Sequence, residues 1–240
     1  MAEANSNLGK LYLIPTTLGD NEPLEVLPIA IKRAIENIDY YIVENEKTAR
    51  SSIKKISSNK SQPKLQIEVL NKYTEPQEIP GFLDPCLAGN DMGILSEAGC
   101  PGIADPGAEV VKIAHRKGIK VVPLVGPSSI LLALMASGMN GQNFAFNGYL
   151  PIDSSERKKA IKKMERISND QGQSQLFIET PYRNDKLLAE MLKSLSNQTL
   201  LCIACDITLA TEFIATKSIA EWKKSPVDLH KRPSIFIIQA

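Results

Sequence analysis

The feature that most constrains this fold is a repeated alternation of short apolar runs with helical patterns. The runs are rich in Val, Ile, Leu and Tyr and stop at proline, glycine or charged residues, and apolar residues at helical spacing follow them. In the first half, the expected strands are 11–14, 40–43, 65–70, 92–95 and 120–124, and the expected helices are 28–37, 49–56 and 105–118. This alternation is typical of a parallel sheet covered by helices.

Local signals place several helix ends. Asp105 suits the N-cap position of one helix, which Gly118 ends. Ser128 and Ser129 open an almost wholly apolar helix that Gly138 ends, and a helix that is apolar all round is expected to pack on several sides. The other expected elements of the second half are strands at 144–149, 175–178, 200–206 and 234–239, helices at 155–167, 184–195 and 219–223, and a polar loop at 168–174.

The change of character near residue 124 predicts two α/β lobes, residues 1–123 and 124–240. With 28 basic and 27 acidic side chains, the net charge of +1 gives no overall attraction to nucleic acid or to an anionic membrane. The longest apolar run is far too short to span a bilayer. The four cysteines are scattered and the first ten residues lack the pattern of a signal peptide, so we expect a cytoplasmic protein with no membrane partner.

Two loops at predicted strand ends are candidate ligand sites. The Gly- and Pro-rich segment 95–107 leaves a strand and enters a helix, and ligands bind at that place in open α/β sheets. Residues 125–129 repeat this arrangement, with the hydroxyls of Ser128 and Ser129 at a helix start. Neither loop has the spacing of a P-loop or of a dinucleotide-binding fingerprint.

Several charged and cysteine side chains could serve chemistry or only structure. Carboxylates close to predicted strand ends are candidate acid/base groups or ordinary caps: Glu44, Glu97, Glu179, Asp206 and Glu212. A basic helix face either contacts RNA phosphates or is simply solvated: Arg157, Lys158, Lys159, Lys162, Lys163 and Arg166. Cys202 and Cys205 have C-x-x-C spacing but lie in an apolar strand, which favours packing, and no metal site is expected.

Taken in order, the motifs resemble the tetrapyrrole methylase family of S-adenosylmethionine-dependent methyltransferases. The branch that they resemble most comprises the bacterial enzymes that methylate a ribose 2′-hydroxyl of small-subunit ribosomal RNA. The segments that carry the resemblance are LYLIPT (11–16), YIVE (41–44), SEAGCP (96–101), DPG (105–107), VVPLVGPSS (121–129), GYLP (148–151), FIETPYR (177–183) and Glu212. They extend over nearly the whole chain.

The resemblance implies a two-lobed α/β fold, with a mainly parallel N-terminal sheet, a mixed C-terminal sheet and the cofactor cleft between them, usually in a homodimer. It implies S-adenosylmethionine as the methyl donor. The residues expected to contact the donor are Pro15, Ser96, Glu97, Ala98, Gly99, Pro101, Gly102, Asp105, Ser128, Ser129, Glu179 and Thr216. A hydroxyl acceptor needs a base, and Glu44, followed by Glu97, is the expected catalytic residue because each ends a strand at the predicted cleft.

Some positions depart from the pattern of the ribose-methylating branch. Gly19-Asp20 stands for Gly-Asn, Asn45 lies within an otherwise acidic run, and Glu97 stands for an aspartate. Donor binding depends largely on backbone and small residues and survives these changes. Two alternatives therefore stay open beside methylation of ribosomal RNA in the small subunit: a porphyrin or corrin precursor as the acceptor, or a binding protein that keeps the donor and has lost catalysis.

Overall fold

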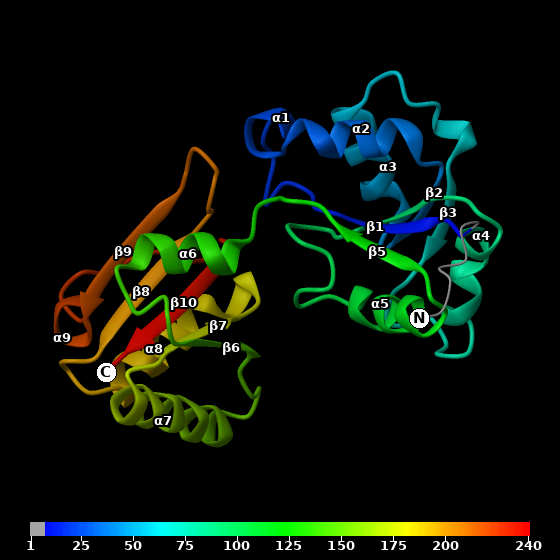
Figure 1. Cartoon of the computed structure of the whole chain (residues 1–240). Helices are drawn as coiled ribbons and strands as arrows, with labels where there is room; N and C mark the ends of the chain where they lie inside the picture. Colours follow the sequence, from blue (N-terminus) through cyan, green and yellow to red (C-terminus); the bar gives the residue numbers. More distant parts are fainter. Residues whose placement is uncertain (1–7) are drawn as a thin grey trace. The chain divides into compact units, whose positions relative to one another are not determined.

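The chain folds into two compact units, Met1–Pro127 and Ser128–Ala240, and the computed structural model describes residues 8–240 (Figure 1). The division falls after Pro127 rather than after residue 123. The Leu124 N–H donates to the Leu13 carbonyl (3.0 Å), and the Cys100 thiol contacts the Pro127 carbonyl (3.3 Å). Segment 124–127 therefore stays bound to the first unit.

The first unit is built on a five-stranded parallel sheet in the order β3-β2-β4-β1-β5. Its strands are β1 (Lys10–Ile14), β2 (Tyr40–Val43), β3 (Gln66–Val69), β4 (Met92–Leu95) and β5 (Lys120–Pro123). Its helices are α1 (Pro23–Val26), α2 (Ile29–Asn37), α3 (Glu46–Ile56), α4 (Asp84–Leu87) and α5 (Gly107–Arg116), with 3-10 turns at Gln62–Lys64 and Ile79–Leu83. The alternation of strands and helices predicted this sheet.

Helices cover both faces of the first sheet. Tyr41 and Val43 pack in one core cluster with residues of α2 and α3, whereas Ile42 between them packs in a second cluster with residues of α5. Figure 1 shows α3 and α5 on opposite sides of the sheet. The chain leaves β2 towards the edge strand β3 and leaves β4 towards β5 on the other side, so the two connections diverge between neighbouring strands. A crevice at the carboxyl ends of such strands is the usual ligand site of this architecture.

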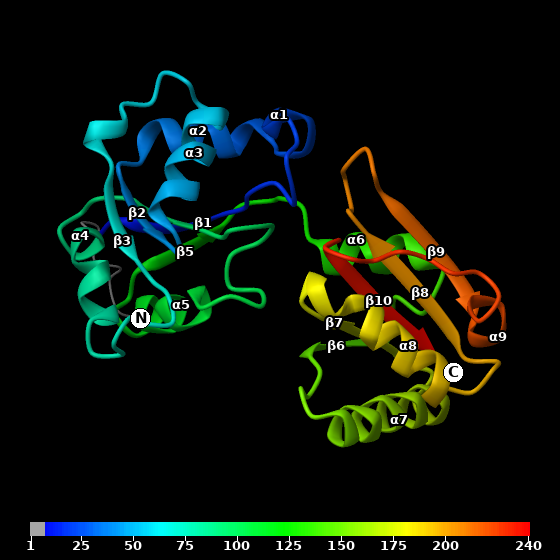
Figure 2. The same cartoon turned by 180° about the vertical axis from the view of Figure 1, so that it is seen from behind.

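The second unit is built on a mixed sheet in the order β6-β7-β10-β8-β9, in which only β6 and β7 pair in parallel (Figure 2). Its strands are β6 (Phe144–Tyr149), β7 (Ser174–Ile178), β8 (Leu200–Cys205), β9 (Phe213–Ser218) and β10 (Ser234–Gln239). Its helices are α6 (Ser129–Ser137), α7 (Ser154–Gln171), α8 (Asn184–Ser194) and α9 (Ile219–Trp222), with a 3-10 turn at Pro181–Arg183. The predicted fold class, with one parallel and one mixed sheet, is confirmed.

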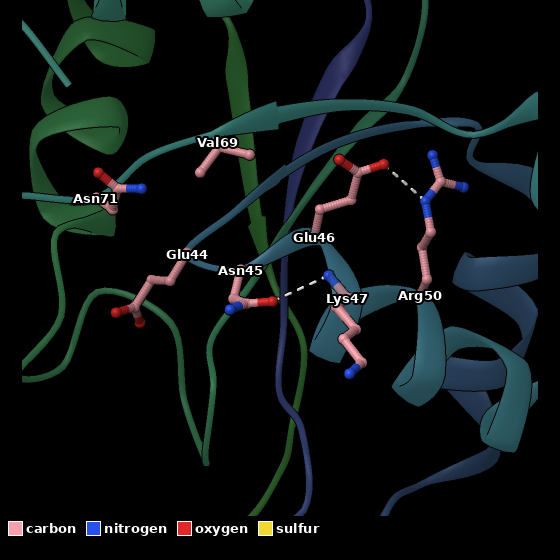
Figure 3. Close-up of a pocket in the computed structure, with 7 residues that line it drawn as sticks. All are labelled: Glu44, Asn45, Glu46, Lys47, Arg50, Val69 and Asn71. Atoms are coloured by element: carbon pink, nitrogen blue, oxygen red, sulfur yellow. Dashed lines mark hydrogen bonds and ion pairs between the residues drawn. The ribbon is translucent and has the colours of Figure 1, made fainter. Parts of the chain in front are cut away.

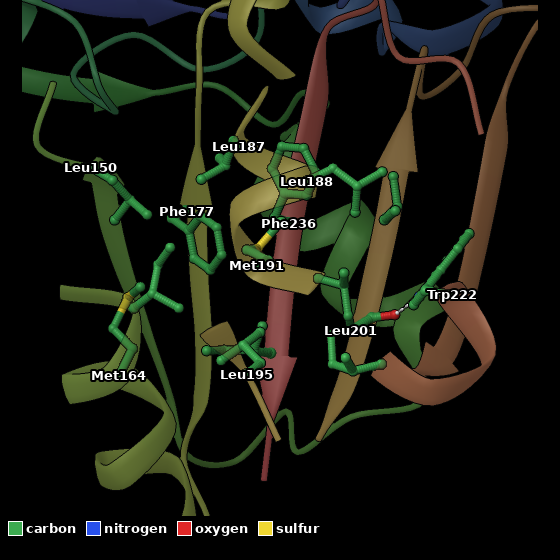
Figure 4. Close-up of a cluster of buried hydrophobic side chains, with 14 of the residues drawn as sticks. Leu150, Met164, Phe177, Leu187, Leu188, Met191, Leu195, Leu201, Trp222 and Phe236 are labelled. Carbon is green, nitrogen blue, oxygen red and sulfur yellow. Dashed lines mark hydrogen bonds between the residues drawn. The ribbon is translucent and has the colours of Figure 1, made fainter. Parts of the chain in front are cut away.

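An aromatic and aliphatic core holds the second unit together (Figure 4). Phe177 of β7 and Phe236 of β10 stack with ring centroids 5.9 Å apart, and Met164 of α7 belongs to the same cluster. The Trp222 indole N–H donates to the Leu201 carbonyl (2.8 Å), which satisfies a polar group that would otherwise be buried alone. Each large side chain buried here contributes roughly 1.5–3 kcal/mol.

Three expectations for the second half were wrong. Residues 168–171 continue α7 instead of forming a loop, and the helix ends at Gly172, whose φ of 61° suits glycine. Strand β9 was not expected. Helix α6 was expected to pack on several sides, but it packs on the sheet of the second unit and leaves Leu131 and Met135 51% and 78% exposed.

Candidate functional site

Three loops at the carboxyl edge of the first sheet are fixed to one another. The Thr16 N–H donates to the Gly99 carbonyl (3.0 Å) and the Thr16 hydroxyl donates to the Ser96 carbonyl (3.1 Å), so the loop after β4 is tied to the end of β1. The Cys100 thiol contacts the Pro127 carbonyl, which ties the same loop to the segment after β5. Such a set of loops is preorganised for a ligand. Thr16 was missed by sequence reasoning, although it directly follows the predicted Pro15.

Pro15 lies where β1 ends, against the segment that follows β5. A Cβ atom on residue 126 would come within 2.2 Å of Pro15 Cβ, so only glycine fits at Gly126. The other ligand-contact residues predicted in the first unit all lie in the loop between β4 and α5: Ser96, Glu97, Ala98, Gly99, Pro101, Gly102 and Asp105. The structure therefore brings the candidates of the first unit to one edge of one sheet.

The loop between β4 and α5 has a strained backbone held by one carboxylate. Gly102 has a φ of 79°, and Ala104 has a φ of 60°, which costs a residue with a Cβ atom roughly 1–2 kcal/mol. Asp105 Oδ1 accepts hydrogen bonds from the Gly102 N–H (2.7 Å) and the Gly107 N–H (2.9 Å). Pro106, not Asp105, occupies the N-cap position of α5, because the Asp105 side chain spans the loop and the first helical residue.

The two carboxylates predicted as acid/base groups lie close together between β2 and β4. The Thr48 hydroxyl donates to Glu97 Oε1 (2.5 Å). Burial raises the pKa of Glu44, the negative charges of Asp105 and Glu97 raise it further, and the Glu97 backbone N–H acts to lower it. A carboxylate whose pKa is raised in this way is a stronger proton acceptor than an exposed one.

Two hollows adjoin Glu44. A small cavity is lined by Ile42, Val43, Glu44, Leu70, Ile94, Leu95, Asp105, Pro106 and Gly107. A larger hollow of about 480 Å³ opens at the ends of β2 and β3 and is lined by Glu44, Asn45, Glu46, Lys47, Arg50, Val69 and Asn71 (Figure 3). Figure 3 shows the Glu44 side chain directed away from the Glu46–Arg50 pair.

Asn45, one of the departures from the expected motif, is the N-cap of α3. Its Oδ1 accepts from the Lys47 N–H (2.9 Å) and the Thr48 N–H (3.2 Å). Asparagine and aspartate serve almost equally well at this position. The departure at Asn45 therefore preserves the local structure that presents Glu44 and Thr48.

The predicted residues of the second unit already have partners within that unit. The Ser128 hydroxyl caps α6, and Ser129 is the first residue of that helix. Glu179 is buried, and its Oε1 accepts from Arg183 Nη2 (2.6 Å). The Thr216 hydroxyl donates to the Ser137 carbonyl (2.8 Å). Their contact with a donor stays a prediction.

Two further carboxylates of the second unit have structural roles. The Asp206 carboxylate accepts from Arg232 Nε (2.7 Å). The Glu212 carboxylate accepts from the Thr208 N–H (2.8 Å). A role for either carboxylate in acid/base chemistry stays a prediction.

The expected basic face of α7 is smaller than the sequence indicated. Arg157 is only 3% exposed, and its guanidinium is engaged by the Glu190 carboxylate, with Nε–Oε2 and Nη2–Oε1 distances of 2.5 and 2.6 Å. Arg157 therefore cannot contact RNA. The exposed cations of this face are Lys158, Lys159, Lys162, Lys163 and Arg166, of which Lys162 pairs with Glu165.

Within residues 8–240, no group of three or more His, Cys, Asp or Glu side chains is placed to hold a metal ion. Cys202 and Cys205 are buried in β8 with free thiols, and burial raises the pKa of each. This agrees with packing as the reason for their spacing. None of the helices in the same range has the length and apolar character needed to cross a bilayer.

Comparison with known sequences finds methyltransferases. No protein-family model matches the chain. It is 29% identical over 214 residues to the ribosomal RNA small subunit methyltransferase I of Vibrio cholerae, covering 88% of this chain and 69% of the relative. It is 25% identical over 239 residues to the protein of the same name from Escherichia coli O157:H7, covering 98% and 79%.

Comparison with solved structures finds tetrapyrrole methylases. The methyltransferase CobJ superposes with a TM-score of 0.64 at 13% identity, over 96% of this chain and 94% of the other. The cobalt precorrin-4 methyltransferase CbiF superposes with a TM-score of 0.61 at 15% identity, over the same shares. The likeness shows a common fold, and together with the sequence relatives it confirms the resemblance drawn from the motifs.

Proposed function

We propose that this chain, a homologue of the ribosomal RNA small subunit methyltransferases with the fold of the tetrapyrrole methylases, transfers a methyl group from S-adenosylmethionine to RNA of the small ribosomal subunit. The acceptor that we propose is a ribose 2′-hydroxyl. The observation that carries the proposal is the carboxyl edge of β2 and β4, where a preorganised loop and a half-buried carboxylate of raised pKa lie together.

The first unit fits the methyl donor. The donor's sulfonium and ammonium groups are cationic, and Glu44, Glu97 and Asp105 lie close enough for Glu97 and Asp105 to raise the pKa of Glu44. At Gly102 the main chain is open to a ligand, because an added Cβ atom would meet no atom closer than 3.9 Å. We propose that the loop after β4 and Pro15 hold the donor. We also propose contacts from Ser128, Ser129, Glu179 and Thr216.

Glu44 is the proposed general base. The donor supplies an electrophilic methyl carbon whose bond to sulfur breaks, with the electron pair going to sulfur, as the new carbon–oxygen bond forms. The Glu44 carboxylate takes the proton of the acceptor hydroxyl. The Glu97 backbone N–H orients that carboxylate, and Thr48 fixes the Glu97 side chain. Exclusion of water from the crevice and alignment of the reacting atoms then contribute to the rate.

The basic face of α7 is proposed to attract the RNA backbone. Lys158, Lys159 and Lys163 are exposed, and no ion pair joins them to another described residue. Their replacement by glutamate is expected to weaken RNA binding at least tenfold and to flatten its dependence on salt. Replacement of Lys193, Lys223 and Lys224 in the same unit is the charge-matched control. Equal losses in both triple variants would exclude a specific role for α7.

We further propose that the protein lies in the cytoplasm, since ribosomal subunits are assembled there. We also propose that it forms a homodimer. The exposed Leu131 and Met135 of α6 offer apolar surface for self-association. Light scattering coupled to gel filtration measures the mass in solution. A monomer at micromolar concentration would exclude the dimer.

The decisive experiment incubates the protein and labelled S-adenosylmethionine with one acceptor at a time. The acceptor is under-methylated 30S subunits in one reaction and tetrapyrrole precursors in the other. We expect label in a ribose of the small-subunit RNA and none in the tetrapyrroles. Calorimetry with the donor and its demethylated product accompanies the assay. Donor binding without transfer would favour a protein that has lost catalysis, label in the tetrapyrroles would identify the other acceptor, and no donor binding would exclude both activities.

A further inference from the structure

The hollow at the ends of β2 and β3 is the starting point of this inference. Its volume of about 480 Å³ lies within the range of small-molecule sites, roughly 300–1,000 Å³. Glu44 forms part of its lining, and Lys47, Arg50 and Asn71 are other lining residues (Figure 3). A cavity that contains the proposed base together with cations and an amide has the chemistry of a nucleotide site.

Two hydrogen bonds hold the Arg50 guanidinium in one orientation and leave other N–H groups able to bind a ligand. Its Nε donates to Glu46 Oε1 (2.8 Å) and its Nη1 donates to the Gln62 carbonyl (2.7 Å), while Nη2 makes no hydrogen bond within residues 8–240. The side chain is 32% exposed. A guanidinium held on two sides loses little entropy when it binds a phosphate oxygen with its remaining N–H groups. Because Glu46 is paired with Arg50, the positive charge of Arg50 offsets the repulsion between Glu46 and an incoming anion.

The loop after β3 carries an exposed aromatic ring two residues beyond Asn71, which lines the hollow. Asn71 Oδ1 accepts from the Tyr73 N–H (2.9 Å), and the Asn71 N–H donates to Thr74 Oγ1 (3.0 Å), so the turn is fixed. Tyr73 is 77% exposed, and the Lys72 ammonium lies 4.8 Å from the centre of its ring. An exposed aromatic ring with a neighbouring cation is the usual platform for stacking a base of single-stranded nucleic acid.

We propose that this hollow binds the acceptor nucleotide in single-stranded RNA, a proposal that rests on the proposed methylation of RNA. Tyr73 stacks on a base, and Arg50 and Lys47 contact phosphate. The Asn71 amide bonds to a base edge, since its Nδ2 has no hydrogen-bond partner in the described part of the chain. This arrangement brings the ribose hydroxyl to Glu44. A base in a duplex is already stacked, so the pocket selects an unpaired nucleotide.

The test compares Tyr73→Ala with Tyr182→Ala. Tyr182 of the second unit is 72% exposed, and the Lys231 ammonium lies 5.9 Å from its ring centre. It therefore matches Tyr73 in exposure and in having a lysine beside the ring, but it lies outside the proposed pocket. We expect Tyr73→Ala to raise the KM for 30S subunits roughly tenfold or more and to weaken binding of a single-stranded RNA of about ten nucleotides by a similar factor. Tyr73→Phe is expected to restore both, and Tyr182→Ala to change neither.

Donor affinity, measured by calorimetry, separates the pocket from the rest of the proposed function. We expect it to be unchanged in Tyr73→Ala and in Arg50→Lys, while Arg50→Lys raises the KM for RNA. Unaltered RNA binding in Tyr73→Ala, or an equal loss in Tyr182→Ala, would overturn the pocket and leave the methyltransferase intact. If the wild-type protein binds the RNA through Tyr73 but transfers no methyl group, the pocket stands and the proposed reaction fails.

Discussion

Glu44 of the first unit and Glu190 of the second unit lie in opposite electrostatic surroundings. In the second unit, Arg157 and Glu190 form a two-pronged ion pair, and Arg157 also donates to the carbonyls of Pro151 and Ile152. In the first unit, the half-buried Glu44 has two carboxylates as neighbours, and its pKa is raised by burial and by their charges. Hydrogen bonding and charge from Arg157 instead lower the pKa of Glu190.

This difference supports the proposed role of Glu44. A buried charge whose partners satisfy it stabilises the fold only while the whole network is present. A carboxylate held in a partly dry place beside like charges costs stability, and such groups are concentrated at functional sites. On this criterion Glu44 is the exceptional charged group, and Glu165 and Asp206 belong to the framework.

Glu44→Gln should have the largest effect. Removal of a general base lowers kcat by about 10²–10⁴-fold, and we expect that loss in methyl transfer to 30S subunits with donor affinity kept within about threefold. Glu68→Gln, on an exposed residue of β3, is the control and should transfer normally. Transfer at the wild-type rate in Glu44→Gln would move the role of base to another residue, first of all Glu97.

Glu190→Ala should be the most destabilising change in the second unit. It leaves the buried Arg157 without a counter-charge, which costs about 3–5 kcal/mol. Trp222 is the single tryptophan of the chain and lies in the core of this unit, so its fluorescence during denaturation reports the loss. Glu109→Gln, which breaks an exposed pair with Lys112, should cost less than about 1 kcal/mol. A comparable small cost at Glu190 would show that the pair is dispensable.

The pH dependence of stability should have opposite signs for Glu165 and Glu44. Burial acts to raise the pKa of Glu165, but hydrogen bonds from the Ser196 N–H, Lys162 and Thr199 outweigh it and lower the pKa overall. Its stabilisation is therefore present above the pKa of an unfolded glutamate and is lost as the pH falls through the folded-state pKa. Glu165→Gln should cost about 1–3 kcal/mol at neutral pH and flatten the acid side of the stability profile.

For Glu44 the sign is reversed. The folded protein binds its proton more tightly than the unfolded chain, so its contribution to the free energy of unfolding falls as the pH rises through the interval between the two pKa values. Glu44→Gln should therefore be at least as stable as the wild type at neutral pH. Denaturation of both variants and the wild type between pH 2 and pH 8 measures the two slopes, since the interval for Glu165 lies below the pKa of an unfolded glutamate. Parallel slopes would contradict the distinction between the two carboxylates.

Ala104→Gly should have the smallest effect. The left-handed φ of 60° at Ala104 suits glycine, so the variant should gain about 1 kcal/mol. Gly102→Ala is the matched variant and should instead lower stability. Its φ of 79° disfavours a residue with a Cβ atom, while the added Cβ itself would meet no atom closer than 3.9 Å. Hydrogen exchange of the β4 amides measures both changes. Destabilisation by Ala104→Gly would show that the backbone there is not strained.

Much of the fold could be predicted from local sequence. Strands 40–43, 92–95 and 234–239 have the predicted bounds, and polar residues flank the first two apolar runs while Pro233 precedes the third. Strand β9 escaped prediction because all six of its residues are half-buried and mix Phe213 and Ile214 with Lys217, so no clean period of two is visible. The extension of α7 escaped because its last turn is polar and its end depends on Gly172.

The site was predicted in part. The loop 96–105 and Glu44 could be found because strand ends and carboxylates are visible in a sequence. The role of Thr48 could not, since its contact with Glu97 joins residues that lie 49 positions apart. The burial of Arg157 was open to prediction: Arg157, Ile161 and Met164 follow at i, i+4 and i+7 on one helix face, and the other two are apolar.

The sequence by itself determined the succession of strands and helices, the glycines that end helices, and the loop chemistry that resembles a methyltransferase. These follow from local rules of backbone geometry and apolar periodicity. Only the tertiary structure decided which charges are buried with partners and which lie beside like charges. Whether Glu44 is a strong base, or Arg157 a framework ion, depends on burial and on partners distant in the chain, and both are set by how the elements pack.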